Sequence, residues 1–108
     1  MIPVSKPKII KEDIRQVVKS LNEGWVSSDG PNVLKFEKKF ARFLGKKYCV
    51  AVSSGTAALE IAVKSLNLKK NDQVLIPNFT IISNALAVVR QNLVPVFIEC
   101  NINNWNID

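Results

Sequence analysis

The chain of 108 residues contains no histidine and only two cysteines, Cys49 and Cys100, which do not form a Cys-x-x-Cys pair. Zinc sites are built mainly from these two residue types, so we expect no metal site. No apolar run reaches the length that spans a bilayer, and no secretory signal opens the sequence. We therefore expect a cytoplasmic protein that does not enter the membrane and keeps its thiols free and buried.

Acidic residues are also in deficit, because 15 Lys and Arg against 9 Asp and Glu give a formal charge of +6. This charge fits an acidic partner such as a nucleotide, a phosphorylated small molecule or a nucleic acid. The lysines are scattered over segments that resemble solvated helix faces, which favours a solubilising surface instead. Arg15, Arg42 and Arg90 are equally dispersed, so we do not expect a nucleic-acid interface.

Apolar residues make up 47% of the chain, which excludes a disordered or fibrous class, and the length allows one domain at most. Helical spacing appears first in residues 11–24, where one stripe is formed by Ile14, Val17, Val18 and Leu21. Pro31 suits the start of a second helix that ends at Gly45. Its predicted packing face consists of Val33, Phe36, Phe40, Phe43 and Leu44.

Strands and helices alternate in the rest of the chain. The pattern predicts strands at 48–53, 74–77 and 94–100, and helices at 56–67 and 80–92. The first of these helices should bury Ala58, Leu59, Ala62, Val63 and Leu66. Strands without polar alternation are typical of parallel sheets covered on both faces, so the fold class is α/β, part of a three-layer α/β/α domain. We expect a helical segment at 1–45 and a β-α-β-α-β segment at 46–108, and three strands would form only half of such a sheet.

The stretch Val50–Ala62, "VAVSSGTAALEIA", passes from strand to helix through small, hydroxyl-bearing residues. Ligands of parallel α/β sheets collect where helices begin, and unpaired N–H groups there attract anions. Gly55 would let an anion approach the backbone, Thr56 would add a hydroxyl donor, and Ser54 would act as a helix cap or a further donor. Spacing alone favours a plain cap by Ser54 or Thr56, because neither the P-loop nor the dinucleotide pattern is present.

A resemblance to a known family favours the anion site over the plain helix cap. The run from "GWVSSDGP" through "SSGTAAL" and "PNFT" to "PVFIECNINNWNID" resembles the amino-terminal part of the DegT–StrS family of nucleotide-sugar aminotransferases, pyridoxal-phosphate enzymes of aminotransferase fold type I. The resemblance implies that the phosphate of pyridoxal 5′-phosphate (PLP) is held by Ser54, Gly55, Thr56 and Ala57. Thr80 and Ile81 would then lie at the cofactor ring.

The same resemblance exposes departures from the family pattern. Ile81 stands where the family has an aromatic residue that stacks on the ring, and whether Phe79 substitutes for it is open. Asn92 replaces a glycine at a helix end, a tolerable change because asparagine accepts left-handed geometry. The loop with Trp25, Ser27 and Ser28 resembles a segment near the active site at the subunit boundary. For Trp25, simple hydrophobic packing is the alternative.

The catalytic groups of the family, a Schiff-base lysine and a carboxylate paired with the pyridinium nitrogen, lie downstream of the matched region. The resemblance therefore implies no catalytic residue within these residues. It implies a homodimeric parent that transfers an amino group, from glutamate as the amino-acid donor, to a keto group of a nucleotide-linked sugar. The alternatives are a sugar dehydratase of the same family and a non-catalytic binding or assembly fragment.

Overall fold

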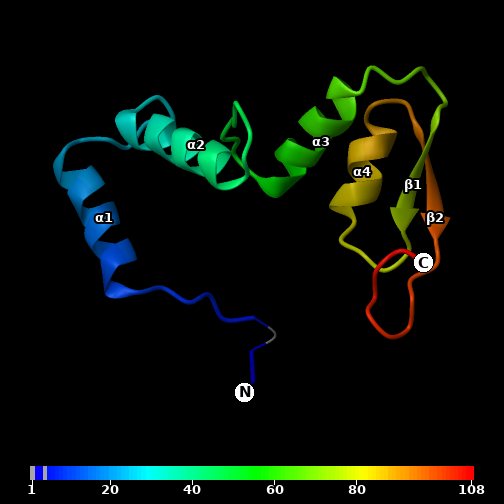
Figure 1. Ribbon diagram of the computed structural model, residues 1–108, viewed down its shortest axis with the longest axis horizontal. Helices are drawn as coiled ribbons and strands as arrows, with labels where there is room; N and C mark the ends of the chain where they lie inside the picture. The colour runs from blue at the N-terminus through cyan, green and yellow to red at the C-terminus, as the bar shows by residue number, and fades with distance from the viewer. Residues whose placement is uncertain (1, 4) are drawn as a thin grey trace. The chain divides into compact units, whose positions relative to one another are not determined.

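The computed structural model describes residues 2–3 and 5–108, which form two compact units, Met1–Ala51 and Val52–Asp108. Each unit is described by itself. Helices α1 and α2 belong to the first unit, and the second holds α3, β1, α4 and β2 in chain order (Figure 1). The division into segments 1–45 and 46–108 stays a prediction.

The first unit confirms both predicted helices, α1 at Lys11–Asn22 and α2 at Pro31–Phe43. The backbone N–H of Ile10 donates to Asp13 Oδ2 at 2.9 Å, which fastens the first turn of α1. Hydrogen bonds from Gln16 and Arg15 lower the pKa of Glu12 in that turn. Gly45, with φ of 64°, follows α2 in the left-handed conformation that glycine adopts without strain.

The apolar stripes of these helices are mostly exposed, so the prediction of a buried packing face on α2 is wrong except at Val33, which is half-buried. Phe43 is 82% exposed, and the buried residue of α2 is Ala41. Phe36 and Phe40 stack on each other along the helix with ring centroids 5.5 Å apart. The stripe of α1 is likewise exposed at Ile14, Val17, Val18 and Leu21. The pattern therefore predicted the helices correctly but not burial, which needs a second element to cover the stripe.

The second unit contains a parallel pair of strands, β1 at Gln73–Pro77 and β2 at Val94–Ile98, with Leu75 opposite Val96. Helix α4, Ser83–Val89, connects them and packs on both, while α3, Gly55–Ser65, packs on α4 (Figure 1). The small core consists of Ile76, Val88 and Leu93, with Val63, Val74 and Ala85 packed against it. The parallel α/β class is confirmed for this unit.

The predicted strand at 48–53 is wrong. Residues 48–53 form no strand, and no residue of the described chain pairs with their backbone as in a sheet. Instead, the Ala51 N–H donates to Glu37 Oε1 at 2.8 Å, within the first unit. A strand is stable only when its backbone groups find a partner in a neighbouring strand, which an apolar sequence run cannot guarantee. Cys49 and Cys100 are free and half-buried rather than fully buried.

The two later helices differ from the prediction in extent and burial. The helix expected at 80–92 begins at Ser83 and ends at Val89, so Thr80 lies before it. On α3, Leu59 and Val63 are half-buried, whereas the other predicted core positions are exposed, namely Ala58, Ala62 and Leu66. Helix α3 packs mainly on α4 within this unit, with Val63 against the small core, so its other side stays exposed. Among the described residues, no helix is both long and apolar enough to cross a bilayer.

Candidate functional site

The start of α3 is built by Ser54. Its backbone is extended, with φ of −161° and ψ of 162°, and its Oγ accepts a hydrogen bond from the Ala57 N–H at 3.2 Å. Its carbonyl accepts from the Ala58 N–H at 3.0 Å, the first bond of the helix. The amides of Gly55 and Thr56 precede these donors, and no described residue accepts a hydrogen bond from them. Ser54 is therefore the helix cap, and two N–H groups remain for a ligand.

Gly55 leaves open space beside these amides. A Cβ built on Gly55 would meet no heavy atom within 4 Å, and φ at this residue is not in the left-handed region. Neither packing nor backbone conformation therefore requires a glycine here. The bare backbone exposes both amides at the positive end of the helix dipole, where an anion is favoured.

Thr56 contacts a residue that sequence reasoning missed. Its Oγ1 lies 3.0 Å from Ser83 Oγ, at the start of α4, and both side chains are partly buried. Two hydroxyl groups that share one hydrogen bond use one of their two protons, so the other proton is available to an acceptor. Ser83 was placed inside a helix by the sequence pattern. Ser83 is the first residue of α4, one position after the N-cap residue Ile82, so the preference of serine for N-caps does not apply to it, and no local sequence pattern indicated its contact with Thr56.

Thr80 and Ile81 lie in the bend between β1 and α4. Asn84 Nδ2 donates to Thr80 Oγ1 at 2.6 Å, and the Ile81 side chain is 67% exposed. Since Ser83 contacts Thr56 and Asn84 contacts Thr80, the two predicted cofactor segments meet around the start of α4.

The loop with Trp25, Ser27 and Ser28 belongs to the first unit. A Cβ on Gly30 would lie 3.1 Å from Trp25 Cε3, so the indole packs directly against that glycine. The Asp29 N–H donates to Ser27 Oγ at 3.1 Å, and Ser28 is exposed. The contact with Gly30 therefore covers part of the Trp25 side chain, and 45% of the residue stays exposed. The boundary role of the loop stays a prediction.

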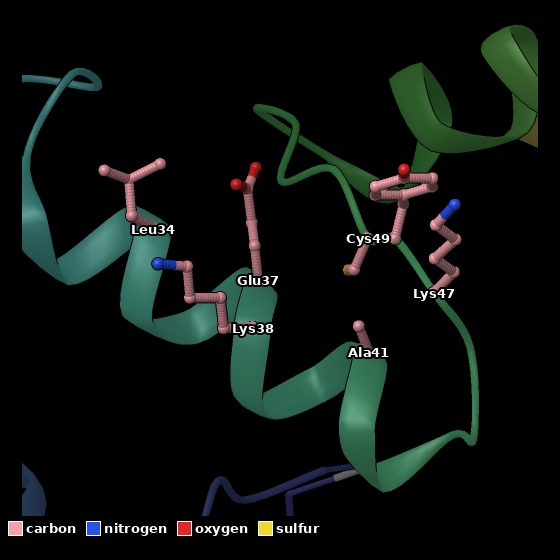
Figure 2. A pocket seen from close by; sticks show the side chains of 7 residues that line it. Leu34, Glu37, Lys38, Ala41, Lys47 and Cys49 are labelled. Atoms are coloured by element: carbon pink, nitrogen blue, oxygen red, sulfur yellow. The ribbon is translucent and has the colours of Figure 1, made fainter.

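A hollow of about 200 Å³ lies beside α2 and is lined by Leu34, Glu37, Lys38, Ala41, Lys47, Tyr48 and Cys49 (Figure 2). Figure 2 shows Glu37 reaching from α2 toward the chain segment that carries Cys49. The Glu37 carboxylate accepts the hydrogen bond from Ala51 and so holds that segment. None of the predicted cofactor residues lines this hollow.

The second unit is an α/β assembly in which parallel strands are joined through a helix and a helix start offers unpaired donors. The sequence matches the family described as the DegT/DnrJ/EryC1/StrS aminotransferase family over residues 7–108. The chain belongs to this family. The resemblance recognised in the sequence is thereby confirmed, and the family is one of PLP-dependent sugar aminotransferases.

Individual relatives agree with this assignment. The chain is 42% identical over 107 residues to the spore coat polysaccharide biosynthesis protein SpsC of Bacillus subtilis, covering 99% of this chain and 27% of that protein. The putative sugar aminotransferase Spr1654 from Streptococcus pneumoniae, in its PLP form, matches with a TM-score of 0.84 and 27% identity, over 99% of this chain and 27% of that one.

A third similar structure is the E. coli GDP-4-keto-6-deoxy-D-mannose-3-dehydratase with bound hydrated PLP. Its TM-score is 0.88 at 26% identity, over 98% of this chain and 28% of that one. The chain thus spans about 27% of the length of the relatives that it matches.

Proposed function

We propose that the whole protein carrying this chain transfers an amino group to a keto group on a nucleotide-linked sugar, with PLP as cofactor and glutamate as donor. Membership of the aminotransferase family supports the reaction class. The name of the similar dehydratase, which contains a GDP-linked keto sugar, supports the substrate class. The observation that carries the proposal is the pair of unused amides at Gly55 and Thr56 beside an open space.

The donors at this helix start fit the phosphate of PLP. A phosphate group has several oxygens that accept hydrogen bonds and needs no acceptor from the protein. It therefore matches a site whose polar groups are all N–H and O–H donors. In our proposal, the amides of Gly55 and Thr56 and the spare hydroxyl proton of the Thr56–Ser83 pair bind these oxygens. Ala57 keeps the approach open with its small side chain, and Ser54 fixes the helix start.

PLP supplies an electron-accepting ring when bound, which the protein's own side chains cannot replace. Thr80 and Ile81 then cover the ring from the bend before α4, where Ile81 is exposed enough to reach a ligand. The Schiff-base lysine and the carboxylate for the ring nitrogen are proposed to lie outside these 108 residues. These residues alone should therefore bind phosphate weakly and transfer no amino groups.

The substrate and the partner subunit belong to the same proposal. The loop of Trp25, Ser27 and Ser28 is exposed, as a segment at a subunit boundary must be before a second copy covers it. We propose a homodimer in the cytoplasm, in which this loop approaches the active site.

A dehydratase is the second candidate, favoured by the similarity to the E. coli dehydratase at a TM-score of 0.88. Both reactions would use the same phosphate site. Two observations on the whole protein distinguish these reactions. One is which residue stands at the position of the Schiff-base lysine, and the other is the product formed from a GDP-linked keto sugar. Formation of an amino sugar supports the transferase, and loss of water without amination supports the dehydratase.

Gly55→Ala tests the site itself. The added methyl enters open space, so the fold should be unchanged or slightly more stable in the absence of PLP. The same methyl would stand between the phosphate and the amides, and the loss of charge-assisted hydrogen bonds should weaken PLP binding about 10- to 100-fold. Absorbance titration with PLP measures this change.

Ala62→Ser serves as the control, because it adds one heavy atom at an exposed position further along α3. Its PLP affinity should equal that of the wild-type protein. An unchanged affinity in Gly55→Ala would remove the phosphate site from this helix start, and with it the proposed function of these residues.

A further inference from the structure

The last residues of the chain form a closed loop, which we define as residues 99–108, just beyond the tips of both strands (red in Figure 1). Cys100 and Ile107 pair as an antiparallel bridge, and the Asn101 N–H donates to the Asn106 carbonyl at 2.8 Å. The side chains of Asn101 and Asn104 accept hydrogen bonds from backbone N–H groups two residues further on. The loop therefore holds its own shape.

Trp105 is the residue that this loop presents. It has a left-handed backbone, with φ of 61°, which is unfavourable for a bulky side chain and is imposed here by the surrounding turns. Its N–H donates to the Asn101 carbonyl at 2.8 Å. The centroids of the indole ring and of the Phe79 ring are 4.9 Å apart, within the range of interacting aromatic pairs, and the two planes are tilted by 46°.

The bend before α4 is also held by hydrogen bonds to the end of β2 and to the first residue of the loop 99–108. The Asn78 N–H donates to the Ile98 carbonyl at 2.9 Å, and its side-chain nitrogen donates to Glu99 Oε2 at 3.0 Å. These bonds and the Phe79–Trp105 contact hold the start of the bend, and Asn84 holds Thr80 from the other side. Thr80 and Ile81 lie between these attachments and belong to neither a strand nor a helix.

We propose that Trp105 is a positioning residue: through its contact with Phe79, it fixes the bend 78–82 so that Thr80 and Ile81 face the cofactor. This inference rests on the proposed function for the identity of the ligand. It also gives Phe79 a role of its own, because its ring is the contact through which Trp105 reaches the bend. The exposure of both aromatic residues, 66% for Phe79 and 58% for Trp105, leaves room for a ligand beside the pair.

The test compares Trp105→Gly with Trp105→Phe in the whole protein. Glycine adopts φ of 61° freely, so Trp105→Gly removes the ring without adding strain to the loop. Phenylalanine keeps an aromatic contact with Phe79. Ile102→Ala is the matched control, because Ile102 lies in the same loop and is 81% exposed.

Amide hydrogen exchange of Asn78 and Asn84, measured without PLP, is the first readout, because their N–H groups donate to the Ile98 and Ile81 carbonyls at the two ends of the bend. Trp105→Gly should accelerate it about two- to tenfold, the range expected for one aromatic contact, while Trp105→Phe and Ile102→Ala leave it near wild type. Equal exchange in Trp105→Gly and the wild type would overturn the proposal, as would a Trp105→Phe variant that behaves like Trp105→Gly.

The affinity for PLP is the second readout. Trp105→Gly should raise the Kd for PLP about two- to tenfold and leave kcat at saturating PLP unchanged, with rescue by Trp105→Phe. A fall in kcat with no change in Kd would overturn a positioning role toward the cofactor. If the wild-type protein binds no PLP, the proposed function fails, and the exchange comparison still decides whether Trp105 holds the bend.

Discussion

Thr56 Oγ1 lies 3.0 Å from Ser83 Oγ, although the two residues are 27 positions apart in the chain. The contact joins the first turn of α3 to the first residue of α4. Either hydroxyl can be the donor, so the pair can turn its spare proton toward an acceptor without breaking the bond between them. We expect the two hydroxyls to act as one unit toward a phosphate.

This coupling predicts the behaviour of Thr56→Val. Valine keeps the shape of the side chain but removes the hydroxyl, so Ser83 loses its partner and the phosphate loses one donor. The affinity for PLP should fall about tenfold, the usual effect of one hydrogen bond to a charged group. Titration with PLP, and separately with inorganic phosphate, measures the change.

Ser83→Ala and the double variant complete the cycle. If the hydroxyls act as one unit, the double variant should lose little more affinity than Thr56→Val alone, because the effects of neighbouring groups are not additive. Losses that add up fully would show that the two hydroxyls bind independently, or that only one of them meets the ligand.

The order of elements in the second unit could be predicted from the sequence, because periodicity reports which backbone conformation a segment prefers. The parallel strands near 74–77 and 94–98 and the helix start after Ser54 follow from local residue patterns. Asn92 illustrates the same point in detail. It was predicted to accept left-handed geometry, and its φ is 58°.

Asn92 therefore predicts a contrast between two substitutions. Asn92→Ala should lower the free energy of unfolding by about 1 kcal/mol, because this conformation is less favourable for alanine than for asparagine. Asn92→Gly should be close to neutral, since glycine adopts it freely. Urea denaturation of both variants measures the difference. Equal losses would mean that the side chain, not the backbone angle, explains the asparagine.

Other features could not be predicted, because they depend on partners distant in the chain. The segment 48–53 has a strand-like composition, yet Ala51 bonds to the Glu37 side chain instead of to a neighbouring strand. Likewise, no local pattern links Phe79 to Trp105 or Thr56 to Ser83. The set of cofactor-binding residues stays a prediction from the family resemblance, and the hydrogen bonds among them could not be derived from any local pattern.

The aliphatic residue at position 81 gives the last prediction. Ile81 is 67% exposed in the bend before α4, so a larger side chain fits without repacking the core. If this position covers the cofactor ring, Ile81→Phe should restore stacking and lower the Kd for PLP about two- to tenfold, the range for one aromatic pair.

Ile82→Phe is the matched control, because Ile82 is the next residue and is equally exposed at 67%. Fluorescence or absorbance titration with PLP distinguishes the two variants. The same gain in both would indicate nonspecific binding to an added ring, and a gain in Ile82→Phe alone would place the cofactor on a different side of the bend.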